Sequence, residues 1–150
     1  MRETYEISDR FLEAGDANHL LYEPLGGGLT FRRTRRYELE FDGGSDAVEA
    51  FVRKTLFDEI SQDLHKGEDP GLQGFAFFLD YGMKPGALDL EKEAILRYFE
   101  GIADPGFTLT SLRIRQRIYL FGGKTDESDR FVRDICNPAI HQWNVTHAHV

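Results

Sequence analysis

The sequence predicts an α+β protein that contains two copies of one strand–helix–strand–helix–strand repeat. Three observations lead to this fold class: an internal repeat, an alternation of aromatic-rich segments with segments of helical apolar spacing, and glycine or proline turns between them. Residues 29–62 and 109–142 align without a gap and are identical at 12 of 34 positions, where chance gives roughly two. Each copy is therefore expected to bury a face against the other. We predict a first repeat at residues 1–64, a linker at 65–73 and a second repeat at 74–150.

The composition predicts a soluble, cytoplasmic protein with one compact body. At 150 residues the chain lies in the single-domain range. Its formal net charge of -8 argues against nucleic acid as a partner, because binding to a phosphate backbone depends on Lys and Arg. The single cysteine excludes an internal disulfide and fits a reducing compartment. The sequence has no apolar run of about 18 residues that would predict a membrane span, and its first residues lack the pattern of a signal peptide.

The first three elements of the second repeat follow from its aromatic and apolar spacing. Gly74–Tyr81 is rich in aromatic residues and predicts a strand. Asp89 is suited to cap a helix whose apolar residues recur at intervals of three and four, and which ends near Gly101 or Ala103. Thr108–Phe121 predicts a long strand in which both faces become apolar, so another layer is expected to cover its second face.

The last helix of the second repeat follows a glycine turn. Thr125 is predicted to cap this helix, with acidic residues in its first turn. Its apolar stripe ends at Cys136, and Asn137 with Pro138 stops it, because the residue before a proline avoids helical angles. Residues 140–145 predict the closing strand.

The first repeat shows the same order with a shorter first helix, since Pro24 and Gly26–Gly28 leave room for no more than about two turns. Its predicted elements are a strand near Glu3–Phe11, a short helix from Asp16, a strand near Arg33–Phe41, a helix at Asp46–Phe57 and a strand near Ile60–Leu64. This order resembles a ferredoxin-like fold, with helices on one side of an antiparallel sheet. Two such repeats are predicted to form a pseudo-dimer, either as one longer sheet or as two sheets packed face to face.

No group of residues predicts catalysis, cofactor binding or a metal site. Cys136 lies on an apolar helix stripe, which is typical of a core thiol and not of a reactive one. Only His147 and His149 are close together, in a tail expected to be frayed, and the spacing of a zinc site is missing. Gly26–Gly28 is not followed by the GK[ST] of a phosphate-binding loop, so we interpret it as a turn.

Four arginines at matched repeat positions are candidate partner contacts. Arg33 and Arg113, like Arg35 and Arg115, are predicted to project to the same side of corresponding strands and to gather positive charge about a pseudo-twofold axis. Guanidinium groups suit the carboxylate or phosphate groups of a partner. The alternative is that they guard a sheet edge against aggregation and form internal ion pairs with the many acidic residues.

Three runs in the second repeat carry the motifs of a known family. They are DYGMKPGALDLEKEAI, TSLRIRQRIYLFG and ICNPAIHQW. Over roughly residues 76–145 the chain resembles the PurS subunit of phosphoribosylformylglycinamidine synthase, in which a strand leads to a KPGVxD turn and the last helix closes on NPxI. Six residues stand at these motif positions: Lys84, Pro85, Gly86, Asn137, Pro138 and Ile140. The tandem arrangement resembles the N-terminal domain of the fused, large form of that synthase, where two PurS-like halves imitate a PurS dimer.

The resemblance implies a noncatalytic role in purine biosynthesis. The synthase uses ATP, Mg and glutamine-derived ammonia to convert formylglycinamide ribonucleotide to the amidine. Its PurS portion joins the ATP-dependent synthetase to the glutaminase and helps ammonia to pass between them. Those two components are therefore the expected partners, the chain itself is expected to bind no cofactor, and self-association is left open. The first repeat departs from the pattern, since residues 12–16 lack the proline–glycine pair and residues 57–59 lack the proline of the helix stop.

Two other classes of function remain open. A ferredoxin-like regulatory module would bind a small metabolite at the interface of its two repeats, and a ligand of the folded form would raise its melting temperature. An enzyme of the dimeric α+β barrel kind would use a central cavity with His141 or His19, and replacing those histidines would abolish turnover.

Overall fold

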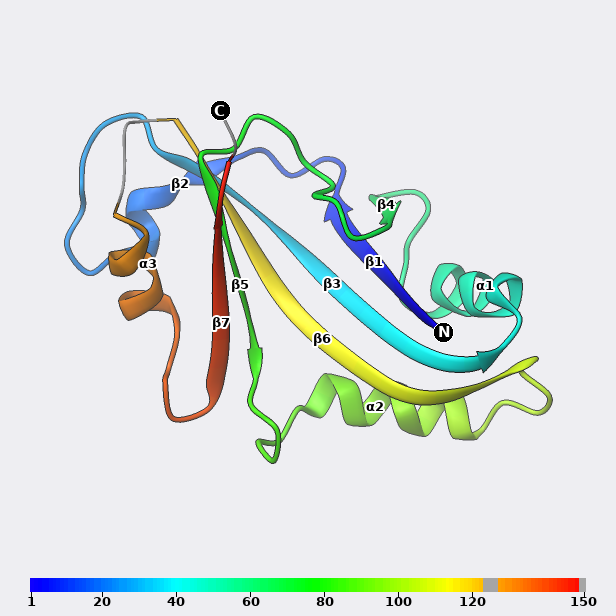
Figure 1. The fold of residues 1–150 in the computed structure, drawn as a ribbon. Coiled ribbons are helices and arrows are strands. Elements are labelled where there is room, and N and C mark those ends of the chain that lie inside the picture. Colours follow the sequence, from blue (N-terminus) through cyan, green and yellow to red (C-terminus); the bar gives the residue numbers. More distant parts are fainter. Residues whose placement is uncertain (123–126, 149–150) are drawn as a thin grey trace. The chain divides into compact units, whose positions relative to one another are not determined.

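A computed structural model describes residues 1–122 and 127–148 of the chain. These residues form an α+β fold with a seven-stranded antiparallel sheet, three α-helices and one short 3-10 helix (Figure 1). The elements in chain order are β1 (Arg2–Asp9), β2 (Gly15–Asp16), η1 (Ala17–Leu20), β3 (Thr30–Gly43), α1 (Ser45–Thr55), β4 (Gln62–Lys66), β5 (Phe77–Met83), α2 (Leu90–Glu100), β6 (Phe107–Phe121), α3 (Ser128–Ile135) and β7 (His141–His147). The strands are hydrogen-bonded in the order β4-β1-β3-β6-β5-β7, and β2 pairs with β3.

The chain divides into two compact units, and each unit is made of three separate segments. Compact unit 1 contains Met1–Phe11, Arg35–Asp69 and Leu88–Ile114. Compact unit 2 contains Leu12–Thr34, Pro70–Ala87 and Arg115–Val150. The two longest strands, β3 and β6, each contribute one part to unit 1 and the other part to unit 2.

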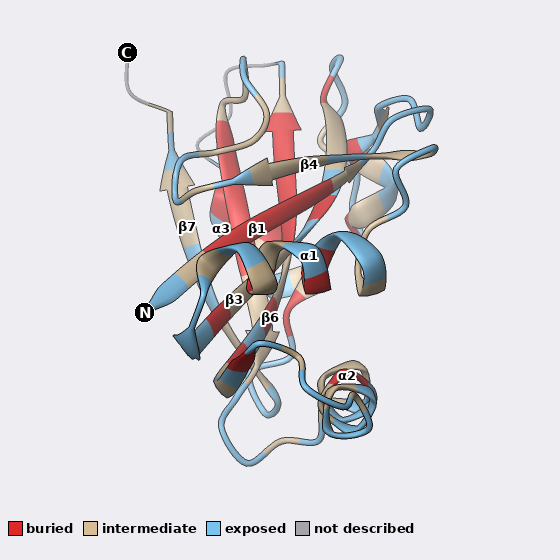
Figure 2. Ribbon diagram, turned by 90° about the vertical axis from the view of Figure 1, so that its right-hand side faces the viewer, coloured by how far each residue is buried: buried red, intermediate tan, exposed pale blue. Residues whose placement is uncertain are grey.

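The core of compact unit 1 lies between its strands and the helices α1 and α2. Phe51 of α1 packs edge-on against Phe99 of α2 and Phe107 of β6, with ring centroids 5.6 Å and 5.7 Å apart. Tyr37 and Leu112 bring β3 and β6 into the same core. Figure 2 shows that burial follows the strands, whereas α1 and α2 bury only part of their surface.

The core of compact unit 2 is built around β5, which pairs with β6 on one side and β7 on the other. Phe77 of β5 lies directly opposite Leu120 of β6, and its ring centroid is 5.9 Å from that of Phe131 in α3. Ala17 of η1 and Leu29 complete the buried set. In this unit β6 is buried on both faces from Arg117 to Leu120, as its apolar pattern predicts.

Each of these cores contains residues from both sequence repeats. In unit 1, Phe51 of the first repeat packs with Phe99 and Phe107 of the second. In unit 2, Ala17 of the first repeat packs with Phe77 of the second. The compact units are therefore not the predicted ranges 1–64 and 74–150, which remain a prediction about the extent of the repeats.

Several predicted element ends are confirmed. The Asp89 carboxylate accepts a hydrogen bond from the Lys92 backbone N–H at 3.1 Å, and Gly101 is the C-terminal cap of α2. Asp16 caps η1 in the same way, and this helix is only four residues long, as expected. The predicted cap Thr125 lies outside the described residues.

The C-terminal histidines are placed differently from the prediction of a frayed tail. His147 is the last residue of β7, and its ring centroid is 5.7 Å from that of Phe77. His149 lies outside the described residues. None of the described helices is long and apolar enough to cross a membrane.

Candidate functional site

The motif residues at the end of β5 form a tight turn. The backbone N–H of Ala87 donates to the carbonyl oxygen of Lys84 at 3.0 Å, with Pro85 and Gly86 between them. Gly86 has φ +88°. A type II turn requires positive φ at its third position, which favours glycine there, and proline is common at its second position. The KPG motif is therefore explained by backbone geometry.

The second motif forms another turn, between α3 and β7. The Asn137 side-chain oxygen accepts a hydrogen bond from the Ala139 N–H at 2.9 Å, and the Asn137 backbone oxygen accepts from the His141 N–H at 2.7 Å. The Asn137 N–H in turn donates to Nδ1 of His141 at 2.9 Å. Asn137 thus satisfies backbone groups of the turn that follows the helix, while Pro138 prevents the helix from continuing.

The two turns are joined by hydrogen bonds, although they are more than fifty residues apart in the sequence. The Lys84 side-chain nitrogen Nζ donates to the carbonyl oxygen of Pro138 at 2.5 Å. The Lys84 backbone N–H donates to the carbonyl oxygen of Ile140 at 2.8 Å. The structure therefore brings together all the motif residues of the predicted resemblance. We call Lys84–Ala87 with Asn137–Ile140 the paired turns; all but Ala87 of these eight residues are exposed.

The histidines considered for an enzyme have structural surroundings. Nδ1 of His141 accepts the Asn137 N–H, and the ring packs against Tyr81 at a centroid distance of 5.2 Å. His19 is 81% exposed at its side chain and lies 3.9 Å from the Asp16 carboxylate. Among the described residues, no three His, Cys, Asp or Glu side chains are grouped so that they could hold a metal ion.

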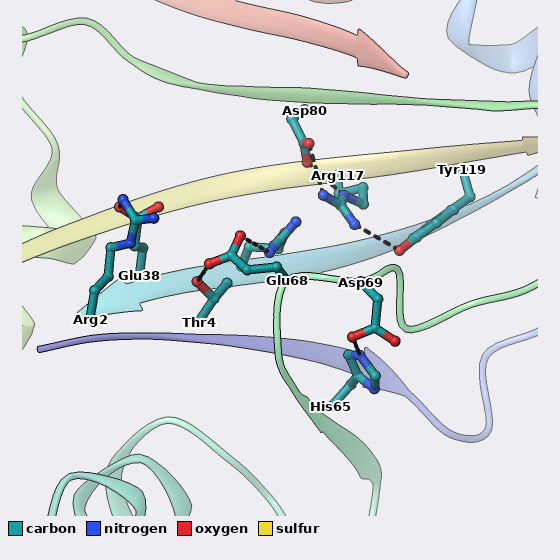
Figure 3. Close-up of polar contacts among 10 residues, drawn as sticks. Arg2, Thr4, Glu38, His65, Glu68, Asp69, Asp80, Arg117 and Tyr119 are labelled. Atoms are coloured by element: carbon teal, nitrogen blue, oxygen red, sulfur yellow. Dashed lines mark hydrogen bonds and ion pairs between the residues drawn. The ribbon is translucent and has the colours of Figure 1, made fainter. Parts of the chain in front are cut away.

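The buried polar cluster of compact unit 2 was not predicted from the sequence. The Arg117 guanidinium donates to both oxygens of Asp80, at 2.7 Å from Nε and 2.9 Å from Nη2, and to the Tyr119 hydroxyl at 3.0 Å (Figure 3). It also lies 3.8 Å from the centroid of the Phe78 ring. The side chains of Arg117 and Asp80 are only 2% and 8% exposed. A signal was present in the sequence, since each of these charged residues interrupts a strand rich in apolar residues.

Compact unit 1 has its own polar contacts, between the predicted linker and the strands. The Thr4 hydroxyl donates to the Glu68 carboxylate at 2.7 Å, and Glu68 also lies 3.7 Å from Arg36 (Figure 3). His65 and Asp69 are 3.1 Å apart, and the hydrogen bond from His65 holds the pKa of Asp69 below its usual value. Residues 65–69 are therefore held by polar contacts to β1 and β3.

The candidate arginines of compact unit 1 lie on opposite faces of the sheet. Arg35 donates to the Glu91 carboxylate at 2.9 Å, beside the Tyr37 hydroxyl, which donates to the same oxygen at 2.8 Å. Arg35 is thus on the face that carries the core. Arg113 lies between Leu112 and Ile114, which both face the core, so it projects to the other side.

Compact unit 2 shows the same arrangement for the other two arginines. The Arg33 guanidinium is 5.6 Å from the centroid of the Phe31 ring, which packs against the core. Arg115 and Arg117 lie on the same face of β6, and the core residue Ile118 lies on the other face. The prediction that the matched arginines project to the same side is therefore wrong. The physical reason is a one-residue shift between the two long strands relative to the ungapped alignment, and such a shift moves every side chain to the other face.

The chain was compared with models of protein families, with curated proteins and with solved structures, and none of them matched it.

Proposed function

We propose that this chain is a noncatalytic, PurS-like subunit or domain of a phosphoribosylformylglycinamidine synthase. The observation that carries the proposal is the hydrogen bonding of Lys84 to Pro138 and Ile140. It joins the two resemblance motifs at one place in compact unit 2, at the adjoining ends of β5 and β7, and this supports the proposal. The ATP, Mg and glutamine of the reaction would be bound by the synthetase and glutaminase components.

The strand order supports the pseudo-dimer that this proposal requires. In the first repeat β1 lies between β4 and β3, and in the second repeat β5 lies between β7 and β6. Each repeat thus places its first strand between its last and its middle strand. This is the arrangement expected of two ferredoxin-like units that meet at β3 and β6.

The paired turns are the surface proposed to contact a partner component. They are exposed, they are held by internal hydrogen bonds, and Ile140 presents an apolar side chain that is 38% exposed. A surface that is already rigid loses little conformational entropy on association. A subunit that joins two enzymes needs such a surface and no reactive group.

Reconstitution of the synthase tests this proposal. The chain is added to purified synthetase and glutaminase components that lack their own PurS. We expect co-elution of the three proteins and restored amidine formation from glutamine. With free ammonium ions as the nitrogen source, the rate of amidine formation should depend less on the chain, because ammonia transfer is then bypassed.

A variant pair locates the contact. Lys84→Met removes the bond from Nζ to Pro138, and we expect it to weaken assembly by about 10-fold. Lys54→Met, at an exposed lysine of α1, is the matched control and should assemble normally. The proposal is wrong if the chain neither co-elutes with the components nor restores the reaction that uses glutamine.

A further inference from the structure

The last strand of the sheet, β7, has one edge that pairs with no other strand in the described part of the chain. At the start of this edge the His141 N–H donates to the Asn137 carbonyl oxygen. The inner edge of β7 pairs with β5 over the seven residues from His141 to His147. An unpaired edge presents backbone N–H and C=O groups that another strand can bind.

The register of β5 and β7 shows which groups point outward. Directly opposite residues are hydrogen-bonded just before and after the ladder, through Lys84 N–H to Ile140 O at 2.8 Å and Ala148 N–H to Ala76 O at 2.9 Å. Hydrogen-bonded pairs alternate along an antiparallel ladder. Gln142, Asn144 and Thr146 therefore bond to β5, and the backbone groups of Trp143 and Val145 point outward.

The composition of this edge lacks the usual protection. Residues 141–147, HQWNVTH, contain no Lys, Arg, Asp, Glu or Pro, which are the residues that guard natural edges. Trp143 is 42% exposed. The opposite edge strand, β4, is shorter and carries Asp63 and Lys66, and Arg10 occupies its Gln62 carbonyl oxygen at 2.9 Å. The two edges of one sheet thus differ in protection, and β7 is the unguarded one.

We propose that β7 pairs with β7 of a second copy of this chain, antiparallel and about a twofold axis at Asn144. This register is the symmetric one, because Asn144 is the middle residue of β7. Trp143 of one copy then lies opposite Val145 of the other, and both residues exchange backbone hydrogen bonds through the groups that point outward. The pairing is isologous, so it closes after two copies.

The side chains of β7 fit this partner. Trp143 beside Val145 is an aromatic and β-branched pair, which is favourable between neighbouring strands. The chain has a formal net charge of -8, but the residues that meet in this register carry no Asp, Glu, Lys or Arg, so like charges are not brought face to face. This inference concerns self-association and does not rest on the proposed function.

A charge-swap experiment tests the register. Asn144 is exposed and meets its own symmetry mate, so Asn144→Asp or Asn144→Lys places two like charges opposite each other. We expect the wild type to have twice the chain mass of 17.2 kDa in sedimentation equilibrium. The dissociation constant of the dimer should be at least about 10-fold higher for each variant alone than for the wild type. An equimolar mixture of the Asp and Lys variants should recover the dimer.

Two further measurements complete the test. The protein has a single tryptophan, so its emission should shift to shorter wavelength as the wild type associates, because Trp143 leaves water. Asn144→Thr, which adds no charge, should still dimerise, and urea unfolding shows whether each variant is folded. The inference is overturned if the wild type is a monomer at every concentration, or if the like-charge variants dimerise as well as the wild type, or if mixing them gives no recovery.

Discussion

Arg117 is a charged side chain in the interior, and its contacts with Asp80, Tyr119 and Phe78 are suited to a guanidinium group. Its two bonds to Asp80 are bidentate, a third bond reaches Tyr119, and the planar group lies over the Phe78 ring. Asp80 and Arg117 are directly opposite in the β5–β6 ladder. The ion pair therefore favours one register of these strands over a shifted one.

Replacing one partner of this pair should be strongly destabilising. In Asp80→Leu the buried Arg117 loses its counter-charge, so we expect the free energy of unfolding to fall by about 3–5 kcal/mol, measured by urea denaturation. The double variant Asp80→Leu with Arg117→Met should recover much of the loss, because the buried charge is then absent. The exposed pair Arg10 and Asp63, 3.0 Å apart, is the control, and Asp63→Asn should cost less than about 1 kcal/mol. Equal losses in the buried and exposed pairs would contradict this account.

Tyr37 makes stability depend on alkaline pH. Burial and the hydrogen bond to Glu91 raise the pKa of Tyr37 to about 12, from about 10 in an unfolded chain. The folded state therefore favours the neutral phenol. Its contribution to stability is complete below pH 10 and is lost as the pH rises from about 10 towards about 12. Burial also raises the pKa of Tyr5, so Tyr37→Phe should reduce the alkaline decline in unfolding free energy without abolishing it. Tyr22→Phe, at an exposed ring, should leave the decline as it is in the wild type.

At the residue scale, the sequence predicted positions better than contacts. Cys136 was expected in a core and is 6% exposed, and burial raises the pKa of its thiol to about 11. The motif residues were expected in turns and lie in turns. The bond from Lys84 to Pro138 and the pairing of Asp80 with Arg117 could not be predicted, because they join segments that no local pattern relates.

Among the elements, α2 depends most clearly on its first residues. Asp89 caps the helix, and Glu91 in its first turn accepts bonds from both Arg35 and Tyr37 of β3. The same turn therefore stabilises the helix end and attaches it to the sheet. Carboxylates at this end are also favoured by the helix dipole.

Removal of the cap should measurably weaken the fold. Asp89→Ala leaves the Lys92 N–H without its acceptor, and we expect a loss of about 1 kcal/mol in the free energy of unfolding by urea titration. Asp89→Ser keeps an oxygen in a suitable place and should lose only a few tenths of that amount. If the serine and alanine variants were equally destabilised, the cap would not be the source of the effect.

The long strands show why the arginine prediction failed while the helix prediction succeeded. The core residues Phe51 and Phe131 are in register in the ungapped alignment, and both are buried. In the strands, however, Phe41 is in the core, whereas its match Phe121 stacks on Tyr119 on the other face. In the first repeat the interval runs from the last core residue of β3, Phe41, to Phe51 of α1. The corresponding interval in the second repeat, from Leu120 of β6 to Phe131 of α3, is one residue longer. An extra residue in the loop before a helix leaves the apolar face of that helix on the core. In a strand, a shift of one residue moves every side chain to the other face of the sheet.

For the whole molecule, the shared cores mean that the sequence repeats are not independent folding units. Phe99 and Phe107 of the second repeat complete the core around Phe51 of the first. The fragments 1–73 and 74–150 should each be largely unfolded alone, and they should regain the circular dichroism of the intact chain when mixed. The intact chain refolded at the same concentration is the control. A native-like spectrum and a cooperative melt from either fragment alone would contradict this prediction.

The α+β class and the order of the main elements could be predicted from the sequence, but the two-residue strand β2 and the division into compact units could not. The predicted ranges are contiguous, since periodicity and turns are properties of neighbouring residues. The observed units each combine three separate segments. That combination depends on which long strand pairs with which, and the sequence carries that information only through packing between distant segments.

The mixed cores also limit how the two copies of a duplicated segment can diverge. When both copies contribute to each interior, a change of volume at Phe51 has to be matched at Phe99 or Phe107, which belong to the other copy. Core residues of one repeat therefore cannot change in volume independently of the other repeat, whereas residues in loops and on outer strand faces can be substituted independently. Natural variants of this chain should therefore show compensating substitutions between the two repeats in the interior, whereas the predicted repeats already differ in their first helix, the short η1 in one and the longer α2 in the other.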